Sequence, residues 1–316
     1  MGILVKNPGP FTTVQDEGRF GYQQYGVTPS GAMDARAFHI ANILAGNPQG
    51  EGALEFTFQG PELQFDDDIV IAVTGGDMQP TLNGAALPMY AAIQVHAGDV
   101  LKFGFSRDGG SRGYLAFFGG LDIPLVMGSR STLAAKNLGG YEGRALKKGD
   151  RIGFLTPGAV PSGMEKRHCP CPVYPEKEVC LRVVLGPQED AFSKEEQRKF
   201  FWYGSKISGE SDRQGCRLER EVPVKHMEDG NIISDGIAFG SIQVPTNGQP
   251  FIMMADRQTV GGYTKIGSVI TVDLPKIAQA KPGMNVRFIQ VSMELAHELY
   301  LRERRELKEL EQSLNS

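Results

Sequence analysis

The sequence predicts a mainly β protein with a few short helices, and two observations carry that prediction. Glycine supplies 40 of the 316 residues, well above its usual share of about 7%. The excess is spread along the chain, so it indicates many turns rather than one linker. Between the turns lie short apolar runs of strand length. The length of the chain favours two domains over one.

The first half is expected to consist of successive strands. Residues 54–58 alternate apolar and polar side chains, and residues 69–73 form a continuous apolar run suited to a buried strand. Asn83-Gly84 is a strong signal for a tight hairpin. Further strands are expected within residues 93–105, at 113–120 and at 148–154.

One helix is expected between Met33 and Leu44, because apolar side chains recur there on one face. Ser30 is its predicted N-cap, and Gly46 with Pro48 gives the predicted stop. His39 lies on this helix. We interpret it as a partly buried, satisfied histidine, since no second catalytic candidate neighbours it in sequence.

The domain boundary is predicted between Thr156 and Glu178, where five prolines and two close cysteines occur without apolar periodicity. The expected division is an N-terminal subdomain over residues 1–160, a connector over 161–178, a C-terminal subdomain over 179–291 and a helix over 292–316. In the second half, Ser193 and Glu196 form a capping box that starts a helix. The other expected elements are strands at 179–185, 240–245, 250–255 and 281–288, and a helical turn at 273–279.

Composition excludes several classes of protein. The net charge is −4 with both signs interspersed, so no nucleic-acid surface is expected. No secretion signal and no apolar run of membrane-spanning length is visible, which favours a cytoplasmic protein. Cys169 and Cys171 have C-x-C spacing in the connector and are interpreted as thiols without a metal role. Cys180 is expected to be a small buried hydrophobe.

The segment after Ala255 is the best candidate for a functional site, because it gathers polar side chains among glycines. Asp256 is suited to act as a base or to orient a donor, and Gln258 and Thr259 offer directed hydrogen bonds. Gly261-Gly262 exposes main-chain N–H groups that suit an anion. Lys265 adds a point charge for carboxylate or phosphate, and we expect it to be an exposed loop cation that contributes little stability. The alternative is a plain turn in which Asp256 pairs with Arg257 at the surface.

A second polar segment lies near the N-terminus. Asp16 and Arg19 are close enough to brace one another, and Arg19 is suited to grip a carboxylate through two hydrogen bonds. The alternative is a loop that an Asp–Arg pair merely staples. Asp34 follows, at the start of the expected helix, where the alternative to a site role is an interaction with the helix dipole alone. The chain contains none of the motifs of a P-loop, a G-x-S-x-G elbow or an H-E-x-x-H zinc site.

These segments belong to an ordered series of motifs that resembles one family closely. The series, as it stands here, is T-V-Q-D-E-G-R-x-G-Y, G-V-x-x-S-G-x-M-D, A-N-x-L-x-G-N, V-T-G-G-D, G-S-R-S-T, S-D-G-x-x-x-G-x-I-Q-V-P and A-D-R-Q-T-V-G-G-Y-T-K-I-G. It is similar to the allophanate hydrolase subunit 2 family, also called the biotin-dependent carboxyltransferase family, and most of all to members that serve as the C subunit of 5-oxoprolinase. The resemblance runs from Val5 to about Val291. Val260, Thr264 and Asp212 depart from the usual pattern of the family, and Asp212 adds a charge to its loop.

The resemblance implies two cyclophilin-like β-barrel subdomains and a heteromeric enzyme. The implied partners are the B subunit of 5-oxoprolinase, which is like allophanate hydrolase subunit 1, and the A subunit, which is of the lactam-utilisation type. The implied reaction is the ATP-dependent opening of 5-oxo-L-proline to L-glutamate, with Mg expected alongside ATP. The alternatives are a carboxyltransferase component of a biotin-dependent urea carboxylase, which needs a separate biotin carrier, and a non-catalytic antagonist of a histidine-kinase inhibitor.

Residue chemistry and resemblance together define the predicted site, which contains no metal. Its groups are split between two segments and include no complete nucleophile–base–orienter set, so the chain is expected to be inert alone. The predicted catalytic residues are Asp256, Gln258 and Lys265. The predicted substrate-binding residues are Asp16, Arg19, Asp34, Gln243, Thr259, Gly261, Gly262 and Tyr263.

Overall fold

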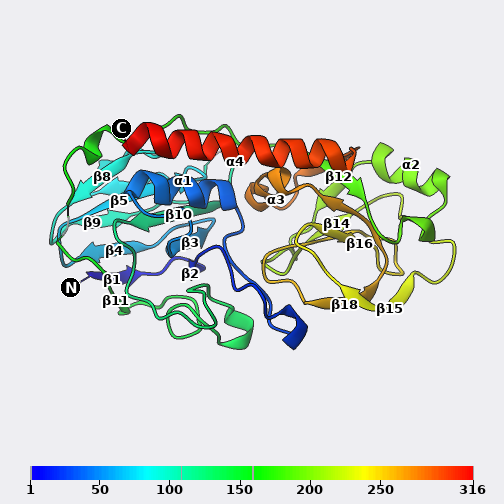
Figure 1. The fold of residues 1–316 in the computed structure, drawn as a ribbon, viewed down its shortest axis with the longest axis horizontal. Helices are drawn as coiled ribbons and strands as arrows, with labels where there is room; N and C mark the ends of the chain where they lie inside the picture. Colours follow the sequence, from blue (N-terminus) through cyan, green and yellow to red (C-terminus); the bar gives the residue numbers. More distant parts are fainter. Residues whose placement is uncertain (1, 108, 159, 316) are drawn as a thin grey trace. The chain divides into compact units, whose positions relative to one another are not determined.

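The computed structural model describes residues 2–107, 109–158 and 160–315, and these divide into two compact units (Figure 1). The first unit comprises Met1–Arg19, Ser30–Tyr174 and Glu306–Ser316, and the second comprises Phe20–Pro29 and Pro175–Arg305. The main division therefore falls after Tyr174, within the segment predicted to hold the boundary. Two details differ from the predicted division. Residues 20–29 group with the second unit, and the C-terminal helix is divided at Glu306.

The first unit contains two sheets in which all neighbouring strands are antiparallel. The six-stranded sheet has the order β11-β1-β4-β9-β6-β7, and the five-stranded sheet has the order β2-β3-β10-β5-β8. Their bounds are β1 Gly2–Asn7, β2 Thr12–Gln15, β3 Ala53–Thr57, β4 Glu62–Phe65, β5 Ile69–Gly75, β6 Thr81–Leu82, β7 Ala85–Ala86, β8 Ala92–Val95, β9 Val100–Lys102, β10 Arg112–Phe117 and β11 Arg151–Gly153.

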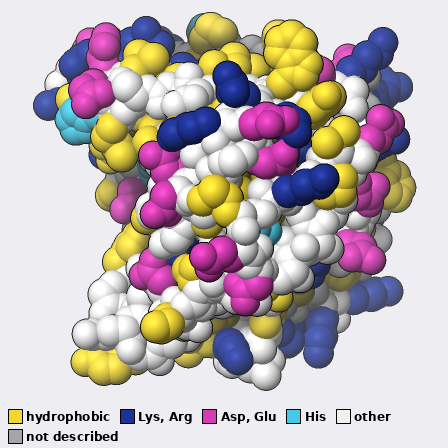
Figure 2. All heavy atoms as spheres, turned by 90° about the vertical axis from the view of Figure 1, so that its right-hand side faces the viewer, with side chains coloured by type: hydrophobic (Ala, Val, Ile, Leu, Met, Phe, Trp, Pro, Cys, Tyr) yellow, Lys and Arg dark blue, Asp and Glu magenta, His cyan; other side chains and the backbone are white. Residues whose placement is uncertain are grey.

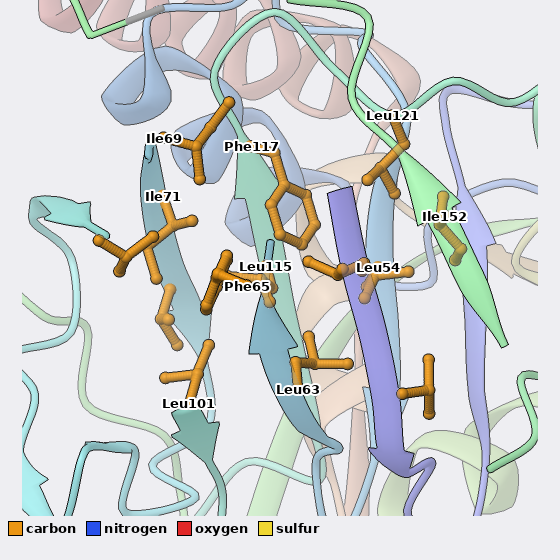
Figure 3. Packing of buried hydrophobic residues seen from close by; sticks show 14 of the residues in the cluster. Leu54, Leu63, Phe65, Ile69, Ile71, Leu101, Leu115, Phe117, Leu121 and Ile152 are labelled. Atoms are coloured by element: carbon orange, nitrogen blue, oxygen red, sulfur yellow. The ribbon is translucent and has the colours of Figure 1, made fainter. Parts of the chain in front are cut away.

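One hydrophobic core holds these two sheets together (Figure 3). Leu63 and Phe65 of β4 and Leu54 and Leu115 of β3 and β10 are almost completely buried in it. The alternation along β4 sends every second side chain inward, as a strand with one buried face requires. The opposite face of the five-stranded sheet is covered by α1 (Ala35–Ala45), which packs in a second cluster.

Helix α1 begins later than predicted, and its N-cap is Asp34 rather than Ser30. Asp34 accepts a hydrogen bond from the Ala37 amide at 2.9 Å, whereas the Ser30 hydroxyl donates to the Thr132 carbonyl at 2.9 Å. Ser30 has a φ of 59°, so its backbone turns away before the helix can start. The predicted stop is confirmed, because Gly46 ends the helix in the left-handed region with a φ of 82°.

The second unit is a closed barrel with the strand order β12-β19-β16-β17-β14-β13-β20, and a separate ribbon of β15 and β18 belongs to the same unit. The bounds are β12 Glu178–Leu185, β13 Ser205–Ile207, β14 Gly215–Glu219, β15 Asn231–Gly236, β16 Ser241–Gln243, β17 Phe251–Met253, β18 Val260–Tyr263, β19 Lys265–Val269 and β20 Asn285–Gln290. The helices are α2 Lys194–Trp202, α3 Leu274–Gln279 and α4 Met293–Asn315, and short 3-10 turns lie at Gln23–Tyr25, Ala134–Lys136, Met164–Lys166, Glu189–Ala191 and Thr271–Asp273.

The mainly β class is therefore confirmed, as are the capped helix α2 and the C-terminal helix. Ser193 caps α2 by accepting a hydrogen bond from the Glu196 amide at 3.2 Å. The prediction for Cys180 is wrong, because this residue lies on the outward face of β12 and is exposed. Val179 and Leu181, on either side of it, take the buried positions. None of the helices in the described part of the chain is both long enough and apolar enough to cross a membrane.

Candidate functional site

In the first unit, Asp16 is a buried anchor for the loop formed by residues 126–132. Its carboxylate accepts hydrogen bonds from the hydroxyl groups of Ser129 and Ser131 and from the amides of Gly18 and Arg130. The Asp16 amide in turn donates to the Ser131 hydroxyl oxygen at 3.0 Å. Only 7% of Asp16 is exposed. This carboxylate is therefore committed to loop structure.

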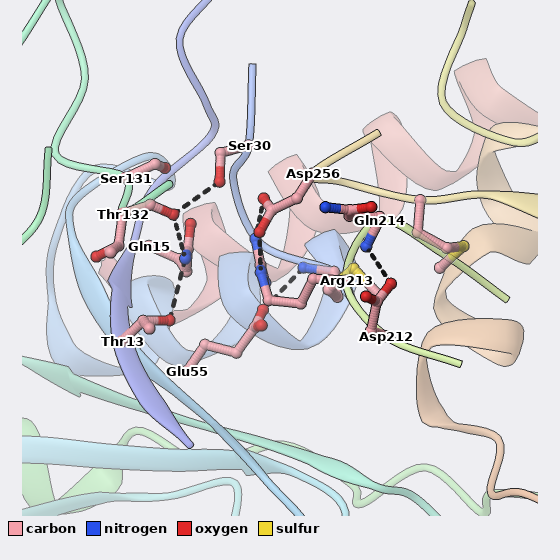
Figure 4. A network of polar contacts seen from close by, with 12 residues as sticks. Thr13, Gln15, Ser30, Glu55, Ser131, Thr132, Asp212, Arg213, Gln214 and Asp256 are labelled. Atoms are coloured by element: carbon pink, nitrogen blue, oxygen red, sulfur yellow. Dashed lines mark hydrogen bonds and ion pairs between the residues drawn. The ribbon is translucent and has the colours of Figure 1, made fainter. Parts of the chain in front are cut away.

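Gln15 and Ser30 tie the same loop down from the other side (Figure 4). The Gln15 amide donates to the Thr13 hydroxyl at 3.0 Å and to the Thr132 carbonyl at 3.1 Å, and its oxygen accepts from the Gly31 amide. The Thr132 carbonyl also accepts from the Ser30 hydroxyl. Both ends of the Gln15 amide are thus used within the first unit.

Arg19 is fully buried and also binds the 126–132 loop. Its Nε donates to the Val126 carbonyl at 2.9 Å, and one Nη donates to the Ser131 carbonyl at 2.8 Å. Asp16 and Arg19 are therefore joined through a third segment rather than by the direct brace that the sequence suggests. A β-carbon on Gly139 would lie 2.3 Å from the Arg19 guanidinium, so glycine is needed for this close approach. A role of Arg19 in anion binding stays a prediction.

Asp34 belongs to a buried cluster of tyrosines and acids in the first unit. Besides capping α1, it accepts a hydrogen bond from the Tyr174 hydroxyl at 3.4 Å, and its amide donates to the Tyr114 hydroxyl at 2.8 Å. Tyr114 donates to Glu55 at 2.7 Å. Burial raises the pKa of Tyr114 well above its usual value, so the phenol stays protonated. A substrate contact of Asp34 remains a prediction.

In the second unit, an irregularity in the barrel brings two predicted site residues together. Ile242 pairs with Gly267 and Gln243 pairs with Lys265, so one extra residue bulges from β19 between them. Bulges of this kind re-aim side chains and are frequent beside active sites. Gln243 and Lys265 become direct cross-strand neighbours, and both are almost completely buried, at 1% and 4% exposed.

Lys265 is a buried strand residue with a fixed partner, and the expectation of an exposed loop cation is wrong. Its ammonium lies 2.9 Å from an Asp235 carboxylate oxygen, and its amide donates to the Gln188 side chain at 3.2 Å. The hydrogen bond from Lys265 holds the pKa of Asp235 below its usual value. A β-carbon on Gly186 would lie 2.3 Å from the Lys265 carbonyl oxygen, so glycine at 186 permits this packing.

Two glutamine amides converge on Gly261. A β-carbon placed on Gly261 would lie 2.8 Å from Gln243 Nε2 and 3.2 Å from Gln258 Nε2. The Gln243 Nε2 is buried and has no hydrogen-bond acceptor among the described residues, while Gln258 is exposed. An unsatisfied buried donor is costly. Such a group, held beside a glycine, is suited to donate to an oxygen of a bound molecule.

Asp256 forms an ion pair with Arg213, so the alternative that it pairs with Arg257 is wrong. Two parallel contacts of 2.9 and 3.0 Å join the Arg213 guanidinium to the Asp256 carboxylate (Figure 4). Arg257 points elsewhere and donates to the Ile237 carbonyl at 3.0 Å; burial lowers its pKa to about 10. Asp256 is thus placed to orient Arg213.

The remaining predicted residues line the ribbon. Gly261 pairs with Asp235 and Tyr263 pairs with Asn231 across β18 and β15, and the Thr259 carbonyl accepts from the Ile237 amide. Gly262 lies between Gly261 and Tyr263 on β18. The second unit therefore gathers Gln243, Gln258, Thr259, Gly261, Gly262, Tyr263 and Lys265 around one ribbon.

Three contributors were missed in the sequence: Asp235, Gln188 and Arg213. Asp235 stands inside the motif Ser234-Asp235-Gly236 that supports the resemblance, so that signal was visible. Gln188 offered none, because its contact with Lys265 depends on how β12 meets β19. We call Gln188, Asp235, Gln243, Gln258, Gly261 and Lys265 the Lys265 cluster.

The fold and the motifs define a carboxyltransferase-type domain. The carboxyltransferase domain family, subdomain A and B, matches residues 25–290, and the chain belongs to this family.

Its relatives include proteins of similar length and much longer proteins. The chain is 36% identical to the C subunit of 5-oxoprolinase from Escherichia coli over 93% of each chain. It is also 36% identical to the urea amidolyase of Lachancea kluyveri, over 93% of this chain and 17% of that protein. The crystal structure of the K. lactis urea amidolyase superposes with a TM-score of 0.91 at 33% identity, covering 98% of this chain and 20% of that one.

Proposed function

We propose that this chain is the C subunit of an ATP-dependent 5-oxoprolinase that opens 5-oxo-L-proline to L-glutamate in the cytoplasm. The observation that carries the proposal is the share of each relative's length that this chain matches. At equal identity, the C subunit of the E. coli 5-oxoprolinase is matched over 93% of its length, whereas the L. kluyveri urea amidolyase is matched over 17%. The A and B subunits of 5-oxoprolinase are the proposed partners.

The chemistry of the Lys265 cluster supports this proposal. A lactam carbonyl is a poor electrophile, and transfer of a phosphoryl group from ATP to its oxygen would activate it for attack by water. Gln243 Nε2 is a buried donor without an acceptor among the described residues, so it suits a carbonyl oxygen. Gln258 would orient the substrate, and Lys265 would steady developing negative charge.

We assign ATP and Mg to the assembled complex rather than to this chain alone. The Lys265 ammonium is already paired with Asp235, and Asp256 is paired with Arg213. An isolated half-site also leaves substrate open to water. The purified chain with ATP and 5-oxoproline should therefore yield neither ADP nor glutamate, and adding the A and B subunits should yield both in equal amounts. Steady turnover by the chain alone would contradict the proposal.

A second candidate function is a carboxyltransferase component that acts on urea with a separate biotin carrier. The structural match to the K. lactis urea amidolyase, with a TM-score of 0.91, favours it. The same reconstitution separates the two functions if it is repeated with carboxybiotin carrier protein and urea. Carboxylation of urea without turnover of 5-oxoproline would favour the second function.

A matched pair of glycine variants tests whether the Lys265 cluster is the site. Gly261→Ala places a methyl group 2.8 Å from Gln243 Nε2 and 2.7 Å from an Ile237 methyl carbon, so the activity of the complex should fall about tenfold or more. Gly209→Ala, in the same unit, meets nothing within 4 Å and should leave activity within about twofold. Equal activity of the two variants would move the site elsewhere.

A further inference from the structure

In the described part of the chain, strand β15 has one edge without a partner strand. It pairs only with β18, and the main-chain groups of Ile232, Ile233 and Ser234 make no hydrogen bond outside this ribbon among the described residues. The pairing also shifts register between Asn231 and Asp235, so three residues of β15 lie opposite one residue of β18. A free edge of this kind is a template for another strand.

The ribbon also exposes apolar side chains to an unusual extent. Ile233 is 95% exposed, Val260 54% and Tyr263 39%. Proteins usually protect an edge strand with Lys, Pro, a β-bulge or a covering element, and the register shift in β15 is one such device. The sequence of β15, Asn-Ile-Ile-Ser-Asp-Gly, contains neither Lys nor Pro.

Charges around the ribbon favour a partner that differs from this chain. Glu228 and Asp229 precede β15 and are exposed, and Asp235 is already paired with Lys265. Lys225 lies beside α2, where its amide donates to Glu196 at 3.1 Å. A second copy would bring like charges together, whereas a basic segment would be attracted. Figure 2 shows charges of both signs interspersed on the face that it draws.

We propose that β15 is the docking strand for an extended segment of a different polypeptide, which pairs with its free edge. The docked segment places an apolar side chain against Ile233 and a basic side chain near Glu228 and Asp229. The identity of the partner rests on the proposed function, in which it is the B subunit of 5-oxoprolinase. Strand addition of this kind takes affinity from main-chain hydrogen bonds and specificity from alternate side chains.

Docking on β15 would act directly on the Lys265 cluster. Asp235 belongs to β15 and contacts the Lys265 ammonium, and its main chain pairs with Gly261. A ribbon fixed by a partner strand holds Asp235 in place, and therefore holds Lys265.

The test is amide hydrogen exchange of the full chain, alone and with the purified B subunit. Exchange should slow across residues 228–238 when the B subunit binds, because the free amides of β15 become paired. Ile233→Asp should weaken the affinity measured by calorimetry about tenfold or more, and Ile233→Ser should weaken it less. Because Ile233 is 95% exposed, both variants should melt like the parent chain.

Trp202→Ala is the matched control. Trp202 is 83% exposed in the same unit and lines a groove of about 790 Å³ beside α2 that includes no residue of β15. This variant should bind the B subunit within about twofold of the parent. Two outcomes would overturn this inference while leaving the proposed function intact. One is a complex that forms without protection of residues 228–238 from exchange. The other is a complex that Trp202→Ala weakens and Ile233→Asp does not. Failure of the parent chain to bind the B subunit would overturn the proposed function as well.

Discussion

The two glycine-rich polar segments look alike in sequence but differ in where their hydrogen bonds lead. In the first unit, Asp16 and Gln15 use their polar atoms on the 126–132 loop. In the second unit, Gln243 Nε2 is buried without an acceptor among the described residues, and Gln258 is exposed. Polar groups that satisfy each other build a loop, whereas a buried donor left open has a stability cost that a ligand removes.

The comparison teaches that residue type alone does not separate a scaffold from a site. Both segments hold a carboxylate, a cation and an amide among glycines. The difference lies in a third segment: residues 126–132 close the first, and the bulge between β16 and β19 opens the second. Substitutions in the first segment should therefore lower mainly stability, and substitutions in the second should lower mainly activity.

The largest loss of stability is expected for Asp16→Ala. The change removes a buried carboxylate and strands the hydroxyl groups of Ser129 and Ser131 and the amide of Arg130. The free energy of unfolding should fall by about 3 kcal/mol, as denaturant titration would measure. Asp122→Ala, at an exposed position of the same unit, should cost less than about 0.5 kcal/mol. Similar losses in the two variants would remove the distinction drawn for the first segment.

Lys265→Ala should lower stability less than Asp16→Ala does, and it should lower activity more. Its stem is buried, so truncation should lower the free energy of unfolding by about 2 kcal/mol. The ion pair with exposed Asp235 should contribute little to stability, because solvent screens it. Activity of the reconstituted complex should fall about tenfold or more.

Lys265→Met separates the two effects, because it keeps most of the buried stem but not the charge. It should retain more stability than Lys265→Ala and lose as much activity. Lys206→Ala, which replaces an exposed lysine of β13, is the control and should change neither quantity measurably. Full activity of Lys265→Met would leave Lys265 with a packing role only.

Most elements of the fold could be predicted from the sequence, because local signals and tertiary packing agree there. Asn83-Gly84 forms its hairpin between β6 and β7 with φ of 52° and 84°, as a tight turn requires. The capping box at Ser193 was equally plain. Cys180 misled because apolar neighbours hid the period-two alternation, which places Val179 and Leu181 inside.

The site could be predicted only as a list of residues, because its geometry comes from contacts distant in sequence. The partner of Asp256 is Arg213, 43 positions away, and the partner of Lys265 is Asp235, 30 positions away. The neighbouring charge of Arg257 is a poor guide, because its guanidinium donates to the Ile237 carbonyl instead.

Gln243→Leu should leave stability almost unchanged or raise it slightly, whereas most substitutions lower stability. The substitution replaces an amide whose Nε2 has no acceptor among the described residues by an apolar group of similar size, so the free energy of unfolding should stay equal or rise by less than about 1 kcal/mol. Activity of the complex should fall, because the open donor is lost. Thermal melting and turnover measure the two effects. A clear loss of stability would mean that this amide is satisfied, and the contrast between the segments would disappear.

The smallest effect on stability is expected at His226, whose side chain contacts both Val244 and Thr264. Its Nε2 lies 3.1 Å from the Val244 carbonyl and 2.9 Å from the Thr264 hydroxyl. Val244 follows Gln243 in the sequence, and Thr264 precedes Lys265. Burial lowers the pKa of His226 below its ordinary value of 6.5, although Asp229 acts in the opposite sense. Between the lowered pKa and about pH 6.5 the unfolded chain binds more protons than the folded chain. Stability should therefore be full above that window and decline as pH falls through it.

His226→Phe tests this dependence, because phenylalanine keeps an aromatic ring against Phe192, whose ring centre lies 4.8 Å from that of His226. The parent chain should lose melting temperature relative to this variant as pH falls from 7 to 5, and the difference should be small because the histidine is only partly buried. His96→Phe serves as the contrast in the first unit. The exposed ring of His96 contacts Asp68, which raises its pKa, so its contribution is present at low pH and lost as pH rises. The melting-temperature contributions of the two histidines should therefore change with pH in opposite directions. Changes in the same direction would contradict the role assigned to His226 in the second segment.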